Sequence, residues 1–322
     1  MDLEAFQQAL NIDVPLAVYE PFENLDTTIV SGRTKARKRI NAPLGTDKTV
    51  SAHLIATHLL ATLKRMHTGE DSVISPYVLQ WIFGMAHEGF DGGRDQQDVN
   101  ELWTLLLEDL EAAGAKELIE RTFLIQSTDE TDAGCDHGPL TKTDSSLLFH
   151  LHPTDKDKHI TLKELFDRRW NHIETDRDYK CDHKDHGEAR LKGAVRTWES
   201  FDKLPECLVL NINRAFYVRK NKQMLKLKTE VRFDLDPIDL GPYTKDKNTA
   251  KYQIVEVIKH CGSGTDAGHY STYKYWRGSW WRMDDDIVTK VPKDKLFSVA
   301  SAINTRKYGG HAAMLFLRHI QE

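Results

Sequence analysis

The 322-residue chain lacks several features that would assign it to a specialised class of protein. Its four cysteines, Cys135, Cys181, Cys207 and Cys261, are too few for a disulfide scaffold at this length, so we expect a reducing compartment. No apolar run is long enough to span a bilayer, and the first residues lack the profile of a signal peptide. The chain also has no internal repeat and no low-complexity segment.

A large excess of charge of one sign is missing as well. The net charge is −5, which gives no general attraction to nucleic acid or to a membrane surface. With 40% hydrophobic and 29% charged residues, the composition is typical of a soluble globular protein. We therefore expect an intracellular protein, cytoplasmic or nuclear, that binds neither nucleic acid nor membrane and folds as one large domain or two ordinary ones.

The most informative stretch runs from residue 268 to residue 288 and predicts a β-hairpin. Its alternating large residues, Tyr270, Tyr273 and Tyr275, suit a half-buried strand. A turn at residues 277–279 follows, and a second strand returns from Trp280. Such a hairpin can set a side chain at the start of its first strand beside one on its second strand.

The two side chains that this hairpin brings together are His269 and Asp284. An imidazole that acts as a base needs a hydrogen-bond acceptor on its other nitrogen, and a carboxylate from the neighbouring strand supplies one. A lone His/Asp pair is more often a structural hydrogen bond than a catalytic one. The pair alone therefore leaves both interpretations open.

The same stretch resembles the histidine box of the ubiquitin-specific proteases, papain-like cysteine proteases that cut ubiquitin from its conjugates. The family pattern is a Gly-His-Tyr turn, a later Trp, a large apolar residue, an Asp or Asn followed by Asp, and a further apolar residue. The matching positions are Gly268, His269, Tyr270, Trp280, Met283, Asp284, Asp285 and Val288.

The resemblance covers about residues 44–318 and implies an α+β, papain-like fold with thumb, palm and fingers. The implied divisions are an N-terminal extension (1–43) and a protease-like domain (44–322), with the thumb at about 44–123, the fingers at about 124–235 and the palm mainly at 204–322. It also implies catalytic roles for His269, Asp284 and Asp285. Gly268 and Tyr270 would contribute to ubiquitin binding.

The family's nucleophilic cysteine stands at the start of a helix, where the positive end of the helix stabilises a thiolate. Apolar residues recur at helical spacing after Ser51 and predict a buried helix, at Ile55, Leu59, Leu63 and Met66. Aligned with the family segment, the nucleophile position falls on Lys48, and Pro43 stands where an amide side chain helps to hold the oxyanion. No cysteine precedes Cys135 in the chain, so the resemblance implies a protein without its nucleophile.

Residues 96–111 resemble the family's Gln-Gln-Asp segment and predict a core helix with Asp95 as N-cap. The resemblance implies that Asp98 faces the basic tail of ubiquitin. Without the resemblance, an Asp in a first helical turn is usually only a favourable partner of the helix dipole.

Two short segments of the predicted fingers resemble degenerate forms of the family's Cys-x-x-Cys zinc knuckles. Gly138 and Lys184 stand where the second cysteines would be. Two thiolates and two histidines can still complete a tetrahedral structural zinc site, and a metal-free knuckle is the alternative. The candidate ligands are Cys135, His137, Cys181, His183 and His186.

The last two cysteines have other predicted places. Cys207 begins a core strand and is expected to be a packed thiol. Residues 261–267 predict a flexible glycine-rich loop at the substrate cleft, and its Cys261 lies on the wrong side of that cleft to replace the nucleophile.

Three hypotheses follow for the whole chain. The first is a catalytically inactive or severely impaired protease-like protein that binds ubiquitin or another protein through the cleft. The second is an active cysteine-type deubiquitinase whose nucleophile has been mutated or is not recognised here. The third is a scaffold that does not bind ubiquitin.

Overall fold

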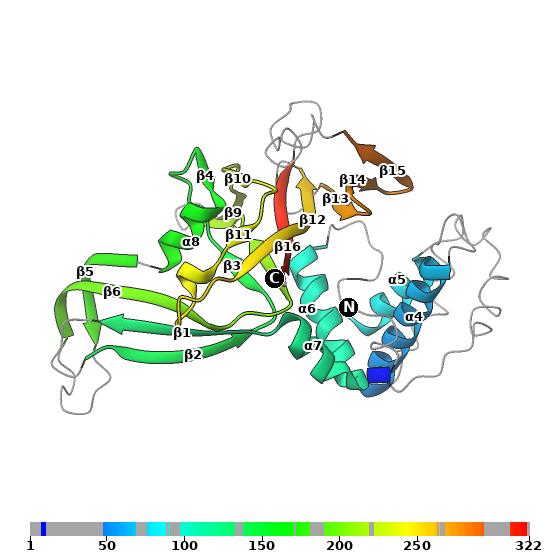
Figure 1. Cartoon of the computed structure of the whole chain (residues 1–322), viewed down its shortest axis with the longest axis horizontal. Coiled ribbons are helices and arrows are strands. Elements are labelled where there is room, and N and C mark those ends of the chain that lie inside the picture. The colour runs from blue at the N-terminus through cyan, green and yellow to red at the C-terminus, as the bar shows by residue number, and fades with distance from the viewer. Residues whose placement is uncertain are drawn as a thin grey trace. The chain divides into compact units, whose positions relative to one another are not determined.

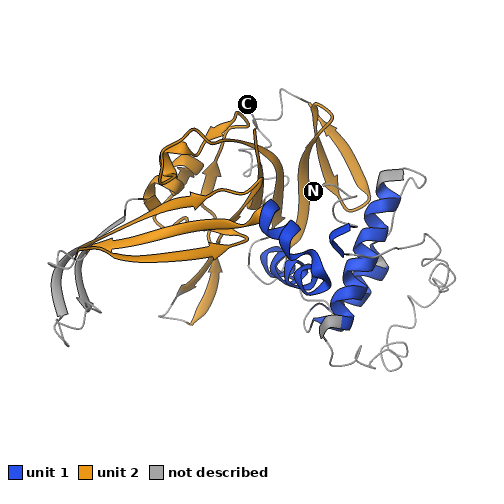
Figure 2. Cartoon of the chain, turned by 60° about the horizontal axis from the view of Figure 1, so that its bottom comes forward, with its two compact units in different colours: residues 1–122 blue, residues 123–322 orange. Residues whose placement is uncertain are grey.

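The chain divides into two compact units, residues 1–122 and residues 123–322, and each is described here by itself (Figure 2). The structure is a computed structural model. It describes residues 8–10, 48–68, 76–87, 90, 97–132, 138–170, 172–180, 190–218, 222–262, 264, 268–292 and 310–320. Among these residues, no helix combines the length and the apolar character needed to cross a membrane.

The first unit is helical in the part of the chain that the structure describes. Its longer elements are α4 (Lys48–Thr68), α5 (Tyr77–Ala86), α6 (Val99–Leu110), the π-helical segment η3 (Glu111–Ala115) and α7 (Lys116–Phe123), the last residue of which begins the second unit. A small apolar cluster, formed by Ile55, Ile82, Phe83 and Phe90, holds α4 against α5 and the residues after it. Ring contacts of Phe83 with His87 and Phe90 add to this packing.

Helix α4 confirms the predicted helix but buries a somewhat different face. The helix already includes residues 48–50, before the predicted start at Ser51. Met66 is 63% exposed and therefore does not belong to the core, because the burial weakens toward the end of the helix. The fully buried positions instead follow a stripe of small and branched side chains, at Ala52, Ile55, Ala56 and Leu60.

The second unit is built mainly of β-strands (Figure 1). The strands of its largest sheet are β3 (Phe149–Leu151), β7 (Cys207–Ile212), β11 (Ile238–Asp239), β12 (Lys251–Cys261), β13 (His269–Trp276), β14 (Ser279–Asp284), β15 (Ile287–Val291) and β16 (His311–His319). Their order is β15-β14-β13-β12-β16-β7-β3, with β11 pairing at the side of β12. All pairs are antiparallel except β3 with β7.

Helix α8 (Leu162–Trp170) and the large sheet share the main hydrophobic core. The core is rich in aromatic rings, and the indole of Trp170 packs on Phe201 with ring centroids 4.5 Å apart. The indole nitrogen of Trp170 donates a hydrogen bond of 2.8 Å to the carbonyl of Tyr243, which lies in the 3-10 turn η5 (Gly241–Tyr243). This bond satisfies the one polar atom of a large buried ring.

A second, four-stranded sheet has the order β2-β1-β6-β5. Its strands are β1 (Ile125–Asp132), β2 (Leu140–Ser146), β5 (His172–Lys180) and β6 (Arg190–Lys203). Because β1 and β6 run antiparallel, β1 ends and β6 begins at the same end of the sheet. Among the described residues, two further small sheets pair β4 (His159–Thr161) with β10 (Glu230–Arg232) and β8 (Ala215–Val218) with β9 (Gln223–Lys226).

These elements confirm the predicted α+β class, with helices in the first unit and sheets in the second. The core strand expected from Cys207 is present as β7, and the two strands of the expected hairpin are present as β13 and β14. The proposed division into thumb, fingers and palm stays a prediction.

Candidate active site

The β13–β14 hairpin carries the candidate active site and is closed by a tight turn. Trp276 pairs with Ser279, so the turn has two residues and not the three predicted. These residues, Arg277 and Gly278, both have positive φ, 47° and 74°, as a type I′ turn requires. Because the twist of this turn matches that of the flanking strands, it fixes the register that sets the two ends of the hairpin opposite each other.

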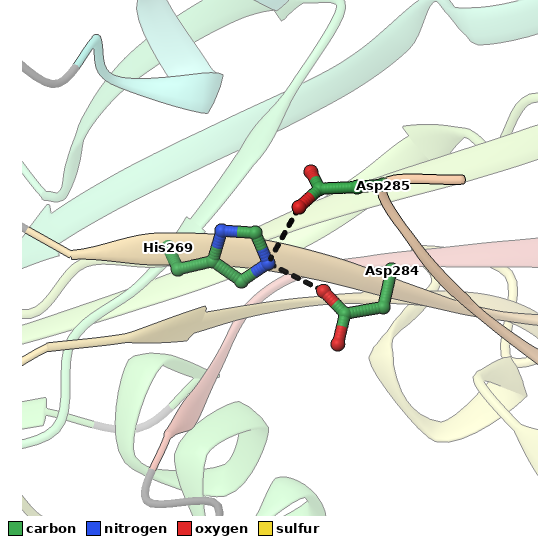
Figure 3. A group of neighbouring side chains, drawn as sticks. All are labelled: His269, Asp284 and Asp285. Atoms are coloured by element: carbon green, nitrogen blue, oxygen red, sulfur yellow. Dashed lines mark hydrogen bonds and ion pairs between the residues drawn. The ribbon is translucent and has the colours of Figure 1, made fainter. Parts of the chain in front are cut away.

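At the open end of the hairpin, His269 and Asp284 are hydrogen-bonded, as the sequence predicts (Figure 3). His269 is the first residue of β13 and Asp284 is the last residue of β14. The bond joins Nε2 of the imidazole to Oδ1 of the carboxylate. The His269 side chain is 47% exposed and that of Asp284 19%, so the carboxylate is the more enclosed partner.

Arg282 holds the second oxygen of Asp284. It lies two residues earlier on β14, on the same face of the sheet, and its Nη2 bonds Oδ2 of the carboxylate. The hydrogen bond from His269, together with the charge of Arg282, lowers the pKa of Asp284 against a smaller opposing effect of burial. Asp284 is therefore an anion held on both oxygens, well suited to orient an imidazole.

Asp285 approaches the same imidazole from the turn after β14, with its Oδ2 3.9 Å from Nε2 of His269. Its side chain is 78% exposed and its φ is 53°, a left-handed conformation that Asp tolerates. Donor atoms of His269, Asp284 and Asp285 all lie within 4.8 Å of one another, so these three residues could contact one cation. Arg282 already neutralises part of this charge, which weakens such a site.

The arrangement has the chemistry of a base and its orienting group. With Nε2 turned to the two carboxylates, Nδ1 lies on the side of the ring that faces neither of them (Figure 3). A neutral imidazole that donates from Nε2 to Asp284 has its lone pair on Nδ1, where it can accept a proton. The pair can therefore activate a thiol or a water that is presented to Nδ1.

Lys48, predicted to take the nucleophile position, is the first described residue of α4 in the other unit. The prediction that its Cα stands at the N-terminal end of a helix is confirmed. Its side chain, together with Pro43 and residues 44–47, lies outside the described residues.

The structure corrects the predicted cap of α6. The helix begins at Val99, and its N-cap is Asp98, not Asp95. Oδ1 of Asp98 accepts hydrogen bonds from the backbone amides of Asn100 (2.7 Å) and Glu101 (3.3 Å). Asp98 thus has the structural role that the residue type alone suggests, and its exposed carboxylate keeps Oδ2 available on the surface of the unit.

Gly268 and Tyr270 flank His269 but do not share its environment. Gly268 is exposed and immediately precedes β13. Tyr270 points to the other face of the sheet, because successive side chains of a strand alternate, and its ring lies 4.7 Å from that of His260. Its predicted contribution to ubiquitin binding stays a prediction.

Sequence reasoning missed two residues of this site. Arg282 could have been found from the alternation of β14, which puts residues 282 and 284 on one face. Cys261 was assigned to a loop, but it is the last residue of β12 and pairs with His269 in the antiparallel register. No local sequence signal gives that register, because it is a pairing between two strands.

The predicted zinc ligands cannot be placed in the same way. Residues 135, 137, 181, 183 and 186 all lie outside the described residues, in the connections that follow β1 and β5. A structural zinc ion bound by Cys135, His137, Cys181, His183 or His186 stays a prediction. The zinc content of the purified protein, measured by elemental analysis, tests it.

Comparisons with known proteins agree with this geometry. The sequence model of a family described as "Ubiquitin carboxyl-terminal hydrolase" matches residues 19–317, nearly the whole chain. A curated relative, "Ubiquitin carboxyl-terminal hydrolase 12" of Salmo salar, is 28% identical over 131 residues. That match covers 38% of this chain and 34% of the relative, so the chain spans about a third of the length of the curated relative that it matches.

Proposed function

This chain belongs to the ubiquitin carboxyl-terminal hydrolase family, and we propose that it is an inactive or severely impaired member that binds ubiquitin or a partner protein. Family membership also establishes the papain-like α+β fold. The observation that carries the proposal is an asymmetry: the base and its orienting carboxylate, His269 and Asp284, are hydrogen-bonded, yet no cysteine precedes Cys135. Without a thiol at the start of α4, His269 has no nucleophile to activate there, and no acyl-enzyme can form at that position.

Lysine is a poor substitute for the missing thiol. A Lys48 ammonium at the start of α4 would meet the positive end of the helix and would not be stabilised there. If a neutral amine attacked instead, the product would be an amide as stable as the isopeptide bond that was cut. Turnover would then stop after one cycle at most.

Binding does not need the nucleophile, because the surface of a protease-like fold can recognise a protein without cutting it. Asp98 is the residue of the first unit that we propose to contact the basic tail of ubiquitin. Both of its amide hydrogen bonds use Oδ1, so the side chain is already fixed. A carboxylate held in this way can accept a charged hydrogen bond from a basic partner through Oδ2 at little cost in side-chain entropy.

The test combines a hydrolysis assay with a binding titration. The chain is incubated with a fluorogenic amide of ubiquitin, and we expect no more release of fluorophore than from a His269→Ala variant. Calorimetric titration with ubiquitin should nevertheless show binding. Turnover that His269→Ala abolishes would instead show an active deubiquitinase, and the absence of both turnover and binding would support a scaffold without ubiquitin affinity.

A matched pair of variants locates the binding site. Asp98→Asn removes the charge but keeps an oxygen that caps α6, since Asn is as good an N-cap as Asp. We expect about a tenfold loss of ubiquitin affinity, the usual effect of losing one charge-assisted hydrogen bond. Glu101→Gln removes the same charge one turn later and should change affinity by less than about twofold. Equal effects of the two variants would argue against a specific role of Asp98.

A further inference from the structure

Cys261 and His269 occupy directly opposite positions on two adjacent antiparallel strands, β12 and β13. Residues paired in this way project to the same face of the sheet, with Cβ atoms about 4.5–5.5 Å apart. The neighbouring pair, His260 and Tyr270, confirms the register, because its two rings are in contact on the other face. The Cβ of Cys261 therefore lies near that of His269, while its Sγ lies beside Gly310 on the β16 side, and a change of rotamer turns the thiol toward the imidazole that Asp284 orients.

The space around this thiol is defined by Gly310, just before β16. A Cβ added at Gly310 would collide with Sγ of Cys261 and would lie 2.7 Å from Cε of Lys259. Cys261 and Lys259 thus share the space that any other residue at 310 would fill. Rotation of Cys261 about its Cα–Cβ bond by about 120°, from one staggered position to the next, changes which neighbour the thiol faces.

Lys259 gives the thiol a cationic neighbour. It is only 5% exposed, and its Cε lies beside the same point near Gly310 as the sulfur of Cys261. Burial lowers the pKa of Lys259, and a thiolate at Cys261 opposes that shift, which places the two groups within range of each other's charge. Burying an ammonium group is costly, and an anion beside it lowers the cost.

A second lysine holds the backbone on both sides of Cys261. Nζ of Lys226 lies 3.0 Å from the carbonyl oxygen of Gly262 and 3.4 Å from that of His260. It is also 2.5 Å from Nδ1 of His260. These contacts fix residues 260–262 as an extension of β12, so Cys261 has a defined position and is not part of a flexible loop.

From this geometry we propose that Cys261 is a modification site, a thiol that reacts with small disulfides and uses His269 as its base. The proton of the thiol passes to His269, and the thiolate attacks one sulfur of R–S–S–R′. A new S–S bond forms between Cys261 and R, while the R–S–S–R′ bond breaks and R′–S⁻ leaves. The leaving thiolate then takes the proton from the imidazolium, so the exchange needs no other reactant.

The proposal does not depend on ubiquitin binding, and Cys207 is an internal control. Cys207 is likewise a reduced thiol of intermediate exposure, but burial raises its pKa to about 11. Its reaction with a disulfide should therefore be slow near neutral pH, since the thiolate is the nucleophile. The two thiols lie in one sheet and differ in whether an oriented histidine lies opposite.

The experiment treats the full chain with 2,2′-dithiodipyridine and follows each cysteine by mass spectrometry of its peptide. We expect Cys261 to react at least about tenfold faster than Cys207. His269→Ala should slow Cys261 by about tenfold and leave Cys207 unchanged, and Lys259→Met should slow Cys261 by a smaller factor. His319→Ala, at an exposed position of β16, should change neither rate.

Two results would overturn the proposal: equal rates at Cys261 and Cys207 in the unmodified chain, or a Cys261 rate that His269→Ala does not lower. The circular dichroism spectrum of each variant shows whether it is folded. If His269→Ala is not folded, the ratio of the Cys261 and Cys207 rates in the unmodified chain still decides, and Asp284→Asn, which loosens the imidazole, supplies the second comparison.

Discussion

The open end of the β13–β14 hairpin and the start of α4 are two places where the family's chemistry is expected, and they differ sharply. The hairpin keeps a histidine, its carboxylate and an arginine that holds the carboxylate. The start of α4 keeps a helix whose buried stripe is intact, with Lys48 where the nucleophile is expected. The comparison teaches that the packing which maintains a fold is separate from the few side chains that give it an activity.

The largest expected effect comes from restoring the nucleophile at the α4 side. Lys48→Cys alone should yield little hydrolysis, because a missing oxyanion donor typically costs about 100- to 1,000-fold in rate. Lys48→Cys combined with Pro43→Asn supplies a thiol and an amide donor, and we expect measurable turnover of a fluorogenic ubiquitin amide only from this double variant. Adding His269→Ala should abolish it.

Either of two outcomes would break the comparison. Activity of the Lys48→Cys single variant equal to that of the double variant would show that the oxyanion site is complete without residue 43. Activity of the double variant that persists after His269→Ala would show that the hairpin pair is not the base.

The dependence of the unfolding free energy on pH tests the hairpin side of the comparison, through Lys226 beside Cys261. Burial, with the charge of Arg214, lowers the pKa of Lys226 from 10.5 to about 8. Between pH 8 and 10.5 the unfolded chain therefore binds more protons at this lysine, so its contribution to stability rises with pH and is complete above 10.5. We expect about 1 to 2 kcal/mol across this window, well below the full linkage value because the side chain is only half-buried.

The measurement is a series of urea midpoints at pH 7.5, 9 and 10, compared between the unmodified chain and Lys226→Met. The variant lacks the titrating group, so the difference in unfolding free energy between the two proteins should shift toward the unmodified chain as the pH rises. Parallel curves would mean that the pKa of Lys226 is not lowered in the folded chain.

The smallest expected effect concerns the turn that sets the hairpin register. Gly278 has φ of 74° and open space where a Cβ would stand, so Gly278→Ala tests the backbone conformation without a steric clash. We expect a loss of about 1 kcal/mol in unfolding free energy, measured by chemical denaturation. Arg277→Asn, a residue favoured in type I′ turns, should cost less, although it removes the guanidinium stacked 4.3 Å from the ring of Trp276.

Much of the fold follows from the sequence because its signals are local. Apolar spacing predicts α4, and alternating large residues predict the β13–β14 hairpin. The choice between Asp95 and Asp98 as N-cap does not follow, since both are good capping residues and the backbone path before the helix decides between them.

The position of Cys261 shows a second limit. Its side chain shares a face with His269 only in one register of β12 and β13, and a slip of one residue would move it to the other face. The pairing of β12 with β16 on its other side supports that register, and β16 is distant from Cys261 in the sequence.

The place of β16 in the large sheet has a consequence for how the protein is made. β16 comes last among the described strands, yet it lies between β12 and β7, and its Leu315 and Leu317 are fully buried. During synthesis, the edges of β12 and β7 that pair with β16 stay open until residues 311–319 have left the ribosome. Open edges of this kind attract other strands, so we expect the incomplete chain to aggregate more readily than the complete one.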